Sequence, residues 1–266
     1  MPTLRELKKR LKSAETIEQL SGAMRSAATA KYRRAGKAFE AYAPYAAALA
    51  EIGGGGAAKP YEDADGRTLF VLLSGNHGLC GGYHQELFAF FTEKAWGRDT
   101  VVCGRRAREW CANKGQAVLN SFSVSDVPSF EEAKELASYV WGLYSEGKAE
   151  RVVIIYQKFI NMLKRAPTAE IFLSGERGRE ADGEETLFVP DRETVEAELE
   201  PLILASNMYE KLLSASAAAQ AATVLAMRAA FDNAQESILE LDTQINRLRQ
   251  AAVTEGVLET SVEFNK

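Results

Sequence analysis

The stretch VLAMRAAFDNAQESILELDTQINRLRQAA, residues 224–252, decides the fold of this chain. Apolar side chains recur in it by alternating steps of three and four residues, and neither Pro nor Gly interrupts it. The members of this repeat are Val224, Met227, Phe231, Ala234, Ile238, Leu241, Ile245, Leu248 and Ala252. A repeat of this period predicts a helix that buries one seam against another helix in a coiled coil.

A second apolar stripe lies in the first fifty residues. Its members are Leu4, Leu7, Leu11, Ala14, Ile17, Leu20, Met24, Ala28, Ala35, Ala38, Tyr42, Tyr45 and Leu49. The two successive three-residue steps from Ala14 to Leu20 predict a stammer, which is a local overwinding of a coiled coil. Two long helices at opposite ends of one chain, each needing a partner, pair most simply with each other. We therefore predict an antiparallel coiled coil between residues 1–52 and residues 192–262.

The middle of the chain alternates between strand-like and helix-like segments. The strand-like segments are 67–74, 100–104, 117–122 and 151–157, and the helix-like segments are 85–96, 105–114 and 129–146. Strands that are separated by helices imply a mostly parallel, Rossmann-like sheet. Residues 168–174 and 186–189 flank an acidic loop and predict a hairpin at one edge. The predicted fold class is α/β with long helices, in which residues 67–190 form a central Rossmann-like domain.

Composition excludes several classes of protein. The hydrophobic content of 46% and the charged content of 26% are typical of a globular protein. The sequence contains no run of eighteen apolar residues, the length that a transmembrane helix needs. The N-terminal sequence MPTLRELKKRLK lacks the apolar core of a secretion signal. The three cysteines are odd in number and form no CxxC motif, which favours a reducing compartment.

The net charge of −5 conceals an asymmetry. Residues 1–37 contain ten Lys or Arg and three Glu, which gives +7, so the rest of the chain carries −12. A basic helix in an acidic protein can bind nucleic acid, anionic lipid or an acidic protein surface. A solvated helix face without a partner explains the same charge.

A glycine-rich loop, GNHGLCGGYH at residues 75–84, lies between a predicted strand and a predicted helix, where phosphates often bind. It matches neither GxxxxGK[ST] nor GxGxxG, so we predict a structural turn rather than a nucleotide site. His77, Cys80 and His84 are possible zinc ligands, but a fourth ligand is missing nearby. We find no catalytic triad, paired carboxylates or HExxH motif, and we predict no cofactor and no catalytic centre.

Several short sequence motifs match those of one protein family in their order and spacing. They are ETIEQLSGAMRSAATAKYRRA at 15–35, APYA at 43–46, GLCGG at 78–82, KFIN at 158–161, PT at 167–168, AMRAAFDNA at 226–234 and NRLRQAAVT at 246–254. Together they resemble the gamma subunit of F-type ATP synthases, the central rotor shaft, along nearly the whole chain. Asn76-His77 departs from the Asp-Arg that this family usually has before GLCGG.

The resemblance implies a function. The chain would be a non-catalytic rotor subunit that couples ion flow through the membrane ring to ATP synthesis and hydrolysis. Its partners would be the alpha and beta subunits, the epsilon subunit and the membrane c-ring, without nucleic acid or a cofactor. It would lie at the cytoplasmic face of the bacterial cell membrane as a peripheral protein. The alternatives are a nucleic-acid-binding or scaffolding coiled-coil protein and a small Rossmann-type enzyme with helical arms.

The resemblance also implies subunit contacts. In this family, acidic lever loops of the beta subunits grip the shaft, and the basic residues of the first helix supply the complementary charge. A catch loop of a beta subunit touches the shaft near its other end. The residues that match these contacts are Met24, Lys31, Arg33, Arg34, Gly78, Leu79, Cys80 and Gly81 for the lever loops, and Arg249, Gln250 and Thr254 for the catch loop.

Overall fold

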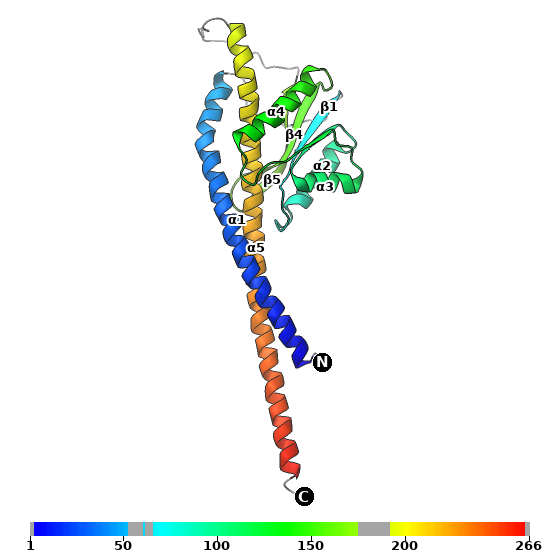
Figure 1. The fold of residues 1–266 in the computed structure, drawn as a ribbon, viewed down its shortest axis with the longest axis vertical. Coiled ribbons are helices and arrows are strands. Elements are labelled where there is room, and N and C mark those ends of the chain that lie inside the picture. Colours follow the sequence, from blue (N-terminus) through cyan, green and yellow to red (C-terminus); the bar gives the residue numbers. More distant parts are fainter. Residues whose placement is uncertain (1–2, 53–60, 62–65, 175–191, 264–266) are drawn as a thin grey trace. The chain divides into compact units, whose positions relative to one another are not determined.

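The computed structural model describes residues 3–52, 61, 66–174 and 192–263 (Figure 1). In chain order its elements are α1 (Leu4–Ile52), β1 (Thr68–Leu73), α2 (Tyr83–Ala95), β2 (Thr100–Cys103), α3 (Arg105–Lys114), β3 (Asn120–Phe122), α4 (Phe130–Ser145), β4 (Arg151–Phe159), β5 (Arg165–Ser174) and α5 (Arg192–Glu263). The predicted fold class, α/β with long terminal helices, is confirmed.

The chain packs into two units. Residues 1–27 and 224–266 form what we call the coiled-coil unit, and residues 28–223 form the α/β unit. The division falls inside both long helices, because the later part of α1 and the earlier part of α5 belong to the α/β unit. The division suggested by the sequence, at residues 1–52, 67–190 and 192–262, stays a prediction.

The α/β unit is built on a five-stranded sheet with the order β3-β2-β1-β4-β5. β1 pairs in parallel with β2 and β4, and β3 pairs in parallel with β2. The carboxyl ends of these four strands therefore meet at one edge of the sheet, which we call the carboxyl edge. β5 pairs antiparallel with β4 in a hairpin that was not predicted. The predicted hairpin between 168–174 and 186–189 stays a prediction, because 186–189 lie outside the described residues.

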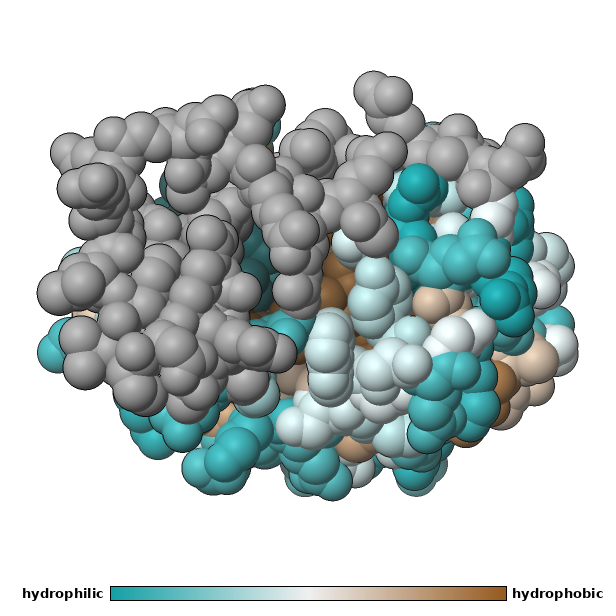
Figure 2. Space-filling model, turned by 90° about the horizontal axis from the view of Figure 1, so that it is seen from above, coloured by the Kyte–Doolittle hydropathy of each residue, from teal (hydrophilic) through white to brown (hydrophobic). Residues whose placement is uncertain are grey.

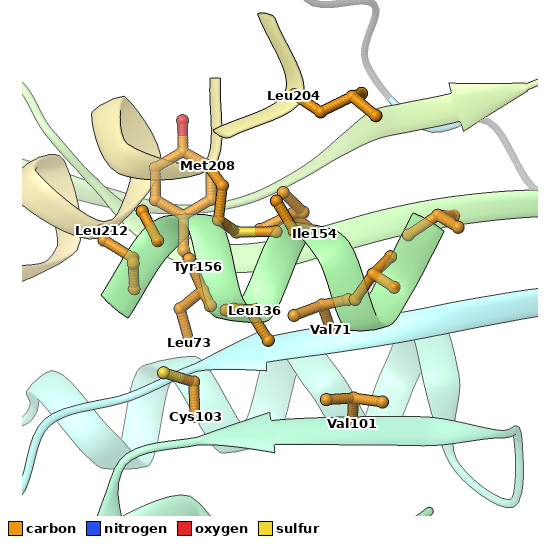
Figure 3. Packing of buried hydrophobic residues seen from close by; sticks show 14 of the residues in the cluster. Val71, Leu73, Val101, Cys103, Leu136, Ile154, Tyr156, Leu204, Met208 and Leu212 are labelled. Carbon is orange, nitrogen blue, oxygen red and sulfur yellow. The ribbon is translucent and has the colours of Figure 1, made fainter. Parts of the chain in front are cut away.

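Helices cover both faces of the sheet. All six residues of β1 are buried, as expected for a parallel strand between two helical layers. On one face, Leu73 and Tyr156 lie in a cluster with Leu136 of α4 and Met208 of α5 (Figure 3). On the other face, Phe70 lies in a second cluster, which includes the side chains of α2. The core of the α/β unit is thus closed on both sides.

The seam predicted on α5 is confirmed from Val224 to Leu248 in the coiled-coil unit, whereas its last predicted member, Ala252, is exposed. Val224, Met227, Ala234 and Ile245 are buried, and the other seam positions as far as Leu248 are half-buried. The residues between the seam positions from 232 to 250 are exposed. This alternation matches a helix that buries one narrow stripe against a single partner helix.

The stammer predicted on α1 is wrong. Ile17, Leu20 and Met24 are 52%, 59% and 38% exposed. The seam instead continues in unbroken steps of four and three residues through polar positions. Its members in the coiled-coil unit are Leu7, Leu11, Ala14, Glu18, Ser21 and Arg25, all of them buried or half-buried.

Local contacts stabilise the polar residues in this seam. The Ser21 hydroxyl donates to the Ile17 carbonyl at 2.7 Å, and Gln235 Nε2 donates to Glu18 Oε1 at 3.0 Å. The Arg25 guanidinium lies 4.7 Å from the centre of the Phe231 ring, a favourable cation–π distance. The pairs 18 with 235 and 25 with 231 also show that the two helices run antiparallel. Counting only apolar side chains therefore assigned the wrong face of α1 to the seam between Ile17 and Met24.

The surface seen in Figure 2 is mostly hydrophilic where it is coloured, with hydrophobic residues in small separate spots. One helical stretch, Glu198–Thr254, is long and apolar enough to cross a membrane by length and composition alone, which the sequence analysis did not predict. Of its apolar window, 56% is buried inside the structure. The core helix of a folded protein meets the same criterion, so this stretch is weak support for a membrane span.

Candidate subunit-contact surfaces

The turn between β1 and α2 holds four of the predicted contact residues, Gly78, Leu79, Cys80 and Gly81. Leu79 is 60% exposed and has a φ of +62°, the only positive φ of a non-glycine residue in the described part of the chain. A left-handed backbone costs roughly 1–2 kcal/mol for such a residue. The leucine side chain therefore adds nothing to the stability of the turn. Cys80 is buried, and burial raises the pKa of its thiol, which keeps it uncharged.

The same loop caps α3. The Asn76 side-chain oxygen accepts from the Arg105 backbone N–H at 3.1 Å, and the Gly75 carbonyl accepts from the Arg106 backbone N–H at 3.2 Å. The Asn76 side-chain nitrogen donates to the Val124 carbonyl. These bonds satisfy the first backbone N–H groups of α3, which have no partner within the helix. Their use by the loop supports the structural role that we predicted for it.

The side chains of His77, Cys80 and His84 have separate environments. His84 is buried, and its two ring nitrogens lie 3.1 Å from Ser74 Oγ and 2.9 Å from the His77 carbonyl oxygen. Its burial lowers the pKa of the imidazole. The His77 side chain lies 3.2 Å from an Asp126 carboxylate oxygen. Among the residues that the structure describes, no group of three or more His, Cys, Asp or Glu side chains is placed to hold a metal ion.

Asp126 links the loop before α4 to both long helices. Its carboxylate lies 2.5 Å from Lys31 Nζ of α1 and 3.2 Å from His77 Nε2, and its carbonyl accepts from the Ser216 hydroxyl of α5 at 2.5 Å. Burial acts to raise the pKa of Asp126, but the hydrogen bond from Lys31 and the charge of His77 lower it overall. We call these four residues the Asp126 latch. The sequence analysis missed it, because an isolated Asp in a loop gives no signal until the fold joins distant segments.

The basic residues of α1 divide into two groups. Lys31 is half-buried and engaged by the Asp126 latch, whereas we expected it to face a partner. Arg33 and Arg34 are exposed, and neither forms an ion pair with any other described residue. Two of the three predicted basic contact residues are thus available to another subunit.

The remaining predicted contact residues lie on the coiled-coil unit. Met24, Arg249, Gln250 and Thr254 are all exposed. Arg249 and Gln250 follow the seam residue Leu248, and the Thr254 hydroxyl donates to the Gln250 carbonyl at 2.9 Å. Their assignment as contacts stays a prediction.

A buried charge cluster that the sequence analysis also missed joins the sheet to α5. Glu170 of β5 lies 3.0 Å from Lys158 Nζ and 3.1 Å from Lys211 Nζ of α5, and it accepts from the Tyr156 hydroxyl at 3.1 Å. Burial acts to raise the pKa of Glu170, but the two lysines lower it overall. We call this group the Glu170 cluster.

Similarity to known proteins assigns this chain to a family. The model of the ATP synthase family matches residues 3–260. Over 276 residues the chain is 30% identical to the ATP synthase gamma chain of Desulfitobacterium hafniense, and each chain is covered to 97%. It is 31% identical to the ATP synthase gamma chain of Desulforamulus reducens, with the same coverage. The chain belongs to the ATP synthase gamma chain family.

The fold agrees with this membership. The rotor of the mitochondrial ATP synthase of Euglena gracilis superposes with a TM-score of 0.71, covering 94% of this chain and 98% of that chain at 14% identity. The predicted resemblance is confirmed, and with it the role of a central-stalk rotor subunit. The nucleic-acid-binding or scaffolding alternative is not supported. As a gamma chain, the protein is a component of a membrane-associated enzyme complex.

Proposed function

We propose that this gamma chain is a non-catalytic shaft that couples ion flow through a membrane c-ring to ATP synthesis and hydrolysis in a ring of alpha and beta subunits. The observation that carries the proposal is the family match over residues 3–260. The epsilon subunit is a further expected partner. The shaft would work at the cytoplasmic face of the bacterial cell membrane, as a peripheral protein.

The surface of the coiled-coil unit supports a surrounding partner. This unit exposes large apolar side chains outside its seam, and they are Leu4, Ile17, Leu20, Met24, Leu239 and Val253. Exposed apolar side chains that lie together mark interaction sites, and Ile17, Leu20 and Met24 lie within one stretch of α1. We infer that the alpha and beta subunits cover these side chains in the assembled complex.

Charged side chains would help to orient the partner subunits at this contact. In the proposal, acidic lever loops of the beta subunits meet Met24, Arg33, Arg34 and the turn 78–81, and a catch loop meets Arg249, Gln250 and Thr254. Complementary charge at such contacts favours one orientation of the partners. Lys31 acts differently, since it holds α1 to the loop before α4 through the Asp126 latch.

Within the α/β unit, the sheet needs firm attachment to the segments of α1 and α5 if it is to turn with them. The Asp126 latch reaches α1 through Lys31 and α5 through Ser216. The Glu170 cluster adds a buried ion pair to α5. These contacts would carry force between the helices and the sheet.

Reconstitution tests the proposal. The full chain is mixed with purified alpha and beta subunits of the same ATP synthase, and ATP hydrolysis is followed at steady state. We expect no hydrolysis by the chain alone, and a clear rise in turnover when it joins alpha and beta. Hydrolysis by the chain alone after removal of contaminants, or an unchanged rate in the mixture, would overturn the proposal.

A further inference from the structure

A cavity of about 340 Å³ lies at the carboxyl edge of the sheet, beside the first turn of α3. Its walls come from three segments, which are the loop after β1, the start of α3 and the end of β3. Open α/β sheets bind their ligands outside the carboxyl ends of the strands, and ligand cavities begin at about 300 Å³. The cavity therefore has the position and the size of a site for a small ligand.

The side chains that line this cavity include positive charges and hydroxyl donors. Arg105 and Arg108 of α3 contribute two guanidinium groups, and Ser121 and Ser123 contribute two hydroxyl groups from the end of β3. The described residues of the lining include no Asp or Glu. Arg108 is exposed and forms no ion pair with any other described residue. Two guanidinium groups without a carboxylate between them favour a ligand that carries two negative charges.

Hydrogen bonds hold the walls of the cavity in place. Arg105 Nε and Nη2 donate to the Asn76 carbonyl at 3.1 and 2.9 Å, and an ion pair with Glu109 at 3.8 Å also involves Nε. The Nη1 donors of this guanidinium are therefore left for a ligand. The Asn76 side chain accepts from the Arg105 backbone N–H at 3.1 Å and donates to the Val124 carbonyl. Donors that are already placed lose little conformational freedom when a ligand binds.

His77 also lines the cavity and adds an imidazole to its basic groups. Its Nε2 lies 3.2 Å from a carboxylate oxygen of Asp126, a residue that does not line the cavity. The same oxygen lies 2.5 Å from Lys31 Nζ, so its charge is already compensated. Asp126 therefore does not neutralise the two arginines.

We propose that this cavity binds a phosphate group, either free phosphate or a phosphate of a nucleotide. Arg105 and Arg108 pair with its charged oxygens, and the hydroxyl groups of Ser121 and Ser123 donate to it as well. The first backbone N–H groups of α3 are engaged by the loop, so side chains recognise the ligand. A bound phosphate joins α3 to the end of β3 and stabilises the α/β unit. This binding goes beyond the proposed function and does not depend on it.

Titration calorimetry of the full chain with inorganic phosphate tests this site. The variant Arg108→Gln is compared with Arg106→Gln, which removes the same charge from α3 at a side chain that does not line the cavity. We expect Arg106→Gln to bind phosphate as the wild type does, and Arg108→Gln to bind it at least about tenfold more weakly. Equal weakening in both variants, or no binding of millimolar phosphate by the wild type, would overturn the inference.

Other anions identify the ligand. Sulfate, a dianion, should compete with phosphate, whereas acetate, a monoanion, should not, and equal competition by acetate would contradict a site for two negative charges. ADP distinguishes the two sources of phosphate. Tighter binding of ADP than of phosphate, lost in Arg108→Gln, identifies a nucleotide, and ADP binding no tighter than phosphate identifies free phosphate.

Nuclear magnetic resonance of the wild-type chain locates the site without any substitution. Phosphate should shift the backbone amide resonances of residues 104–108 and 121–124, which form two walls of the cavity. This result keeps the test decisive even if Arg108→Gln fails to fold, which thermal unfolding of the variant shows. Shifts confined to other parts of the chain would mean that phosphate binds elsewhere and would overturn the inference.

Discussion

The coiled-coil unit and the α/β unit bury apolar surface to very different extents. In the α/β unit, β1 is buried along its whole length, and six consecutive residues of β4 are buried as well. In the coiled-coil unit, the described part of α1 buries only Leu7, Ala14 and Ser21. Two of its larger apolar residues, Ile17 and Leu20, remain exposed. The α/β unit thus encloses a core of its own, whereas the coiled-coil unit buries only a narrow seam.

The two units also place polar groups differently. The α/β unit buries an ion cluster around Glu170, whose charges compensate one another. The coiled-coil unit puts Glu18, Ser21 and Arg25 into its seam, each with a local contact. Polar seam residues in coiled coils specify register at a cost in stability. Substitutions in the ion cluster should therefore change the stability of the α/β unit. Substitutions of polar seam residues should instead change the register of the coiled-coil unit.

The largest expected effect is in the α/β unit. Glu170→Ala leaves Lys211, which is mostly buried, with Glu210 at 3.3 Å as its remaining carboxylate partner, and it also removes the partner of Lys158. Removing one member of a buried ion pair typically costs about 3–5 kcal/mol of unfolding free energy. Urea unfolding of the isolated chain measures this loss. The control Glu109→Ala removes a surface pair with Arg106 and should cost less than about 1 kcal/mol. Similar losses in both variants would contradict a special role for the Glu170 cluster.

The difference between the units also explains which parts of the fold were predictable. Alternating strands and helices give strong local signals, and the α5 seam is apolar at every predicted position. Ser129 was expected to begin α4, and it forms a capping box with Glu132. The α1 seam was misread because its middle positions are polar, and their contacts with Gln235 and Phe231 come from the other end of the chain.

The site was predictable to a smaller degree. Missing phosphate-binding motifs favoured a structural role for the glycine-rich loop, and the structure shows this loop capping α3. The Asp126 latch joins residues 95 positions apart, from Lys31 to Asp126, and no local pattern marks such a pair. The exposed tip of the β4–β5 hairpin was likewise missed. Its KFIN motif supported the family resemblance, but exposure becomes visible only once the strands are paired.

The second-largest expected effect of a substitution concerns the contact between the coiled-coil unit and its partner. The double variant Arg249→Ala with Gln250→Ala changes exposed side chains, so the unfolding free energy should shift by no more than about 0.5 kcal/mol. Loss of a charge-assisted contact to a beta subunit would weaken the interface by roughly 1.5–3 kcal/mol. Coupled ATP synthesis by the reconstituted complex should fall accordingly. Normal synthesis in the double variant would show that these residues carry no torque here.

A smaller effect depends on pH and is confined to the α/β unit, which contains both histidines. Burial lowers the pKa of His84, so the folded state binds fewer protons than the unfolded state. Stability is therefore complete above about pH 6.5 and is lost as the pH falls from there toward the folded-state pKa, by at most about 1.4 kcal/mol per pH unit. Urea unfolding across this range should show a smaller slope for His84→Gln than for the wild type. Equal slopes would show that His84 protonates as freely as in the unfolded chain.

The smallest effect compares two glycines of α1, Gly22 in the coiled-coil unit and Gly36 in the α/β unit. A side-chain carbon added at Gly22 meets the Phe231 ring at 3.4 Å, an ordinary contact, and one added at Gly36 meets nothing within 4 Å. Alanine is better than glycine inside a helix by about 0.5–1 kcal/mol, so each Gly→Ala variant should be more stable than the wild type.

The two variants separate the units because of where the tryptophans lie. Trp96, Trp110 and Trp141 all belong to the α/β unit. Their fluorescence follows the unfolding of that unit alone, whereas circular dichroism follows helix in both. If the coiled-coil unit unfolds independently, Gly22→Ala shifts only the dichroism transition, and Gly36→Ala shifts the fluorescence transition as well. A fluorescence shift in Gly22→Ala would mean that the two units unfold together, and that the continuous helices transmit stability from the coiled coil into the α/β unit.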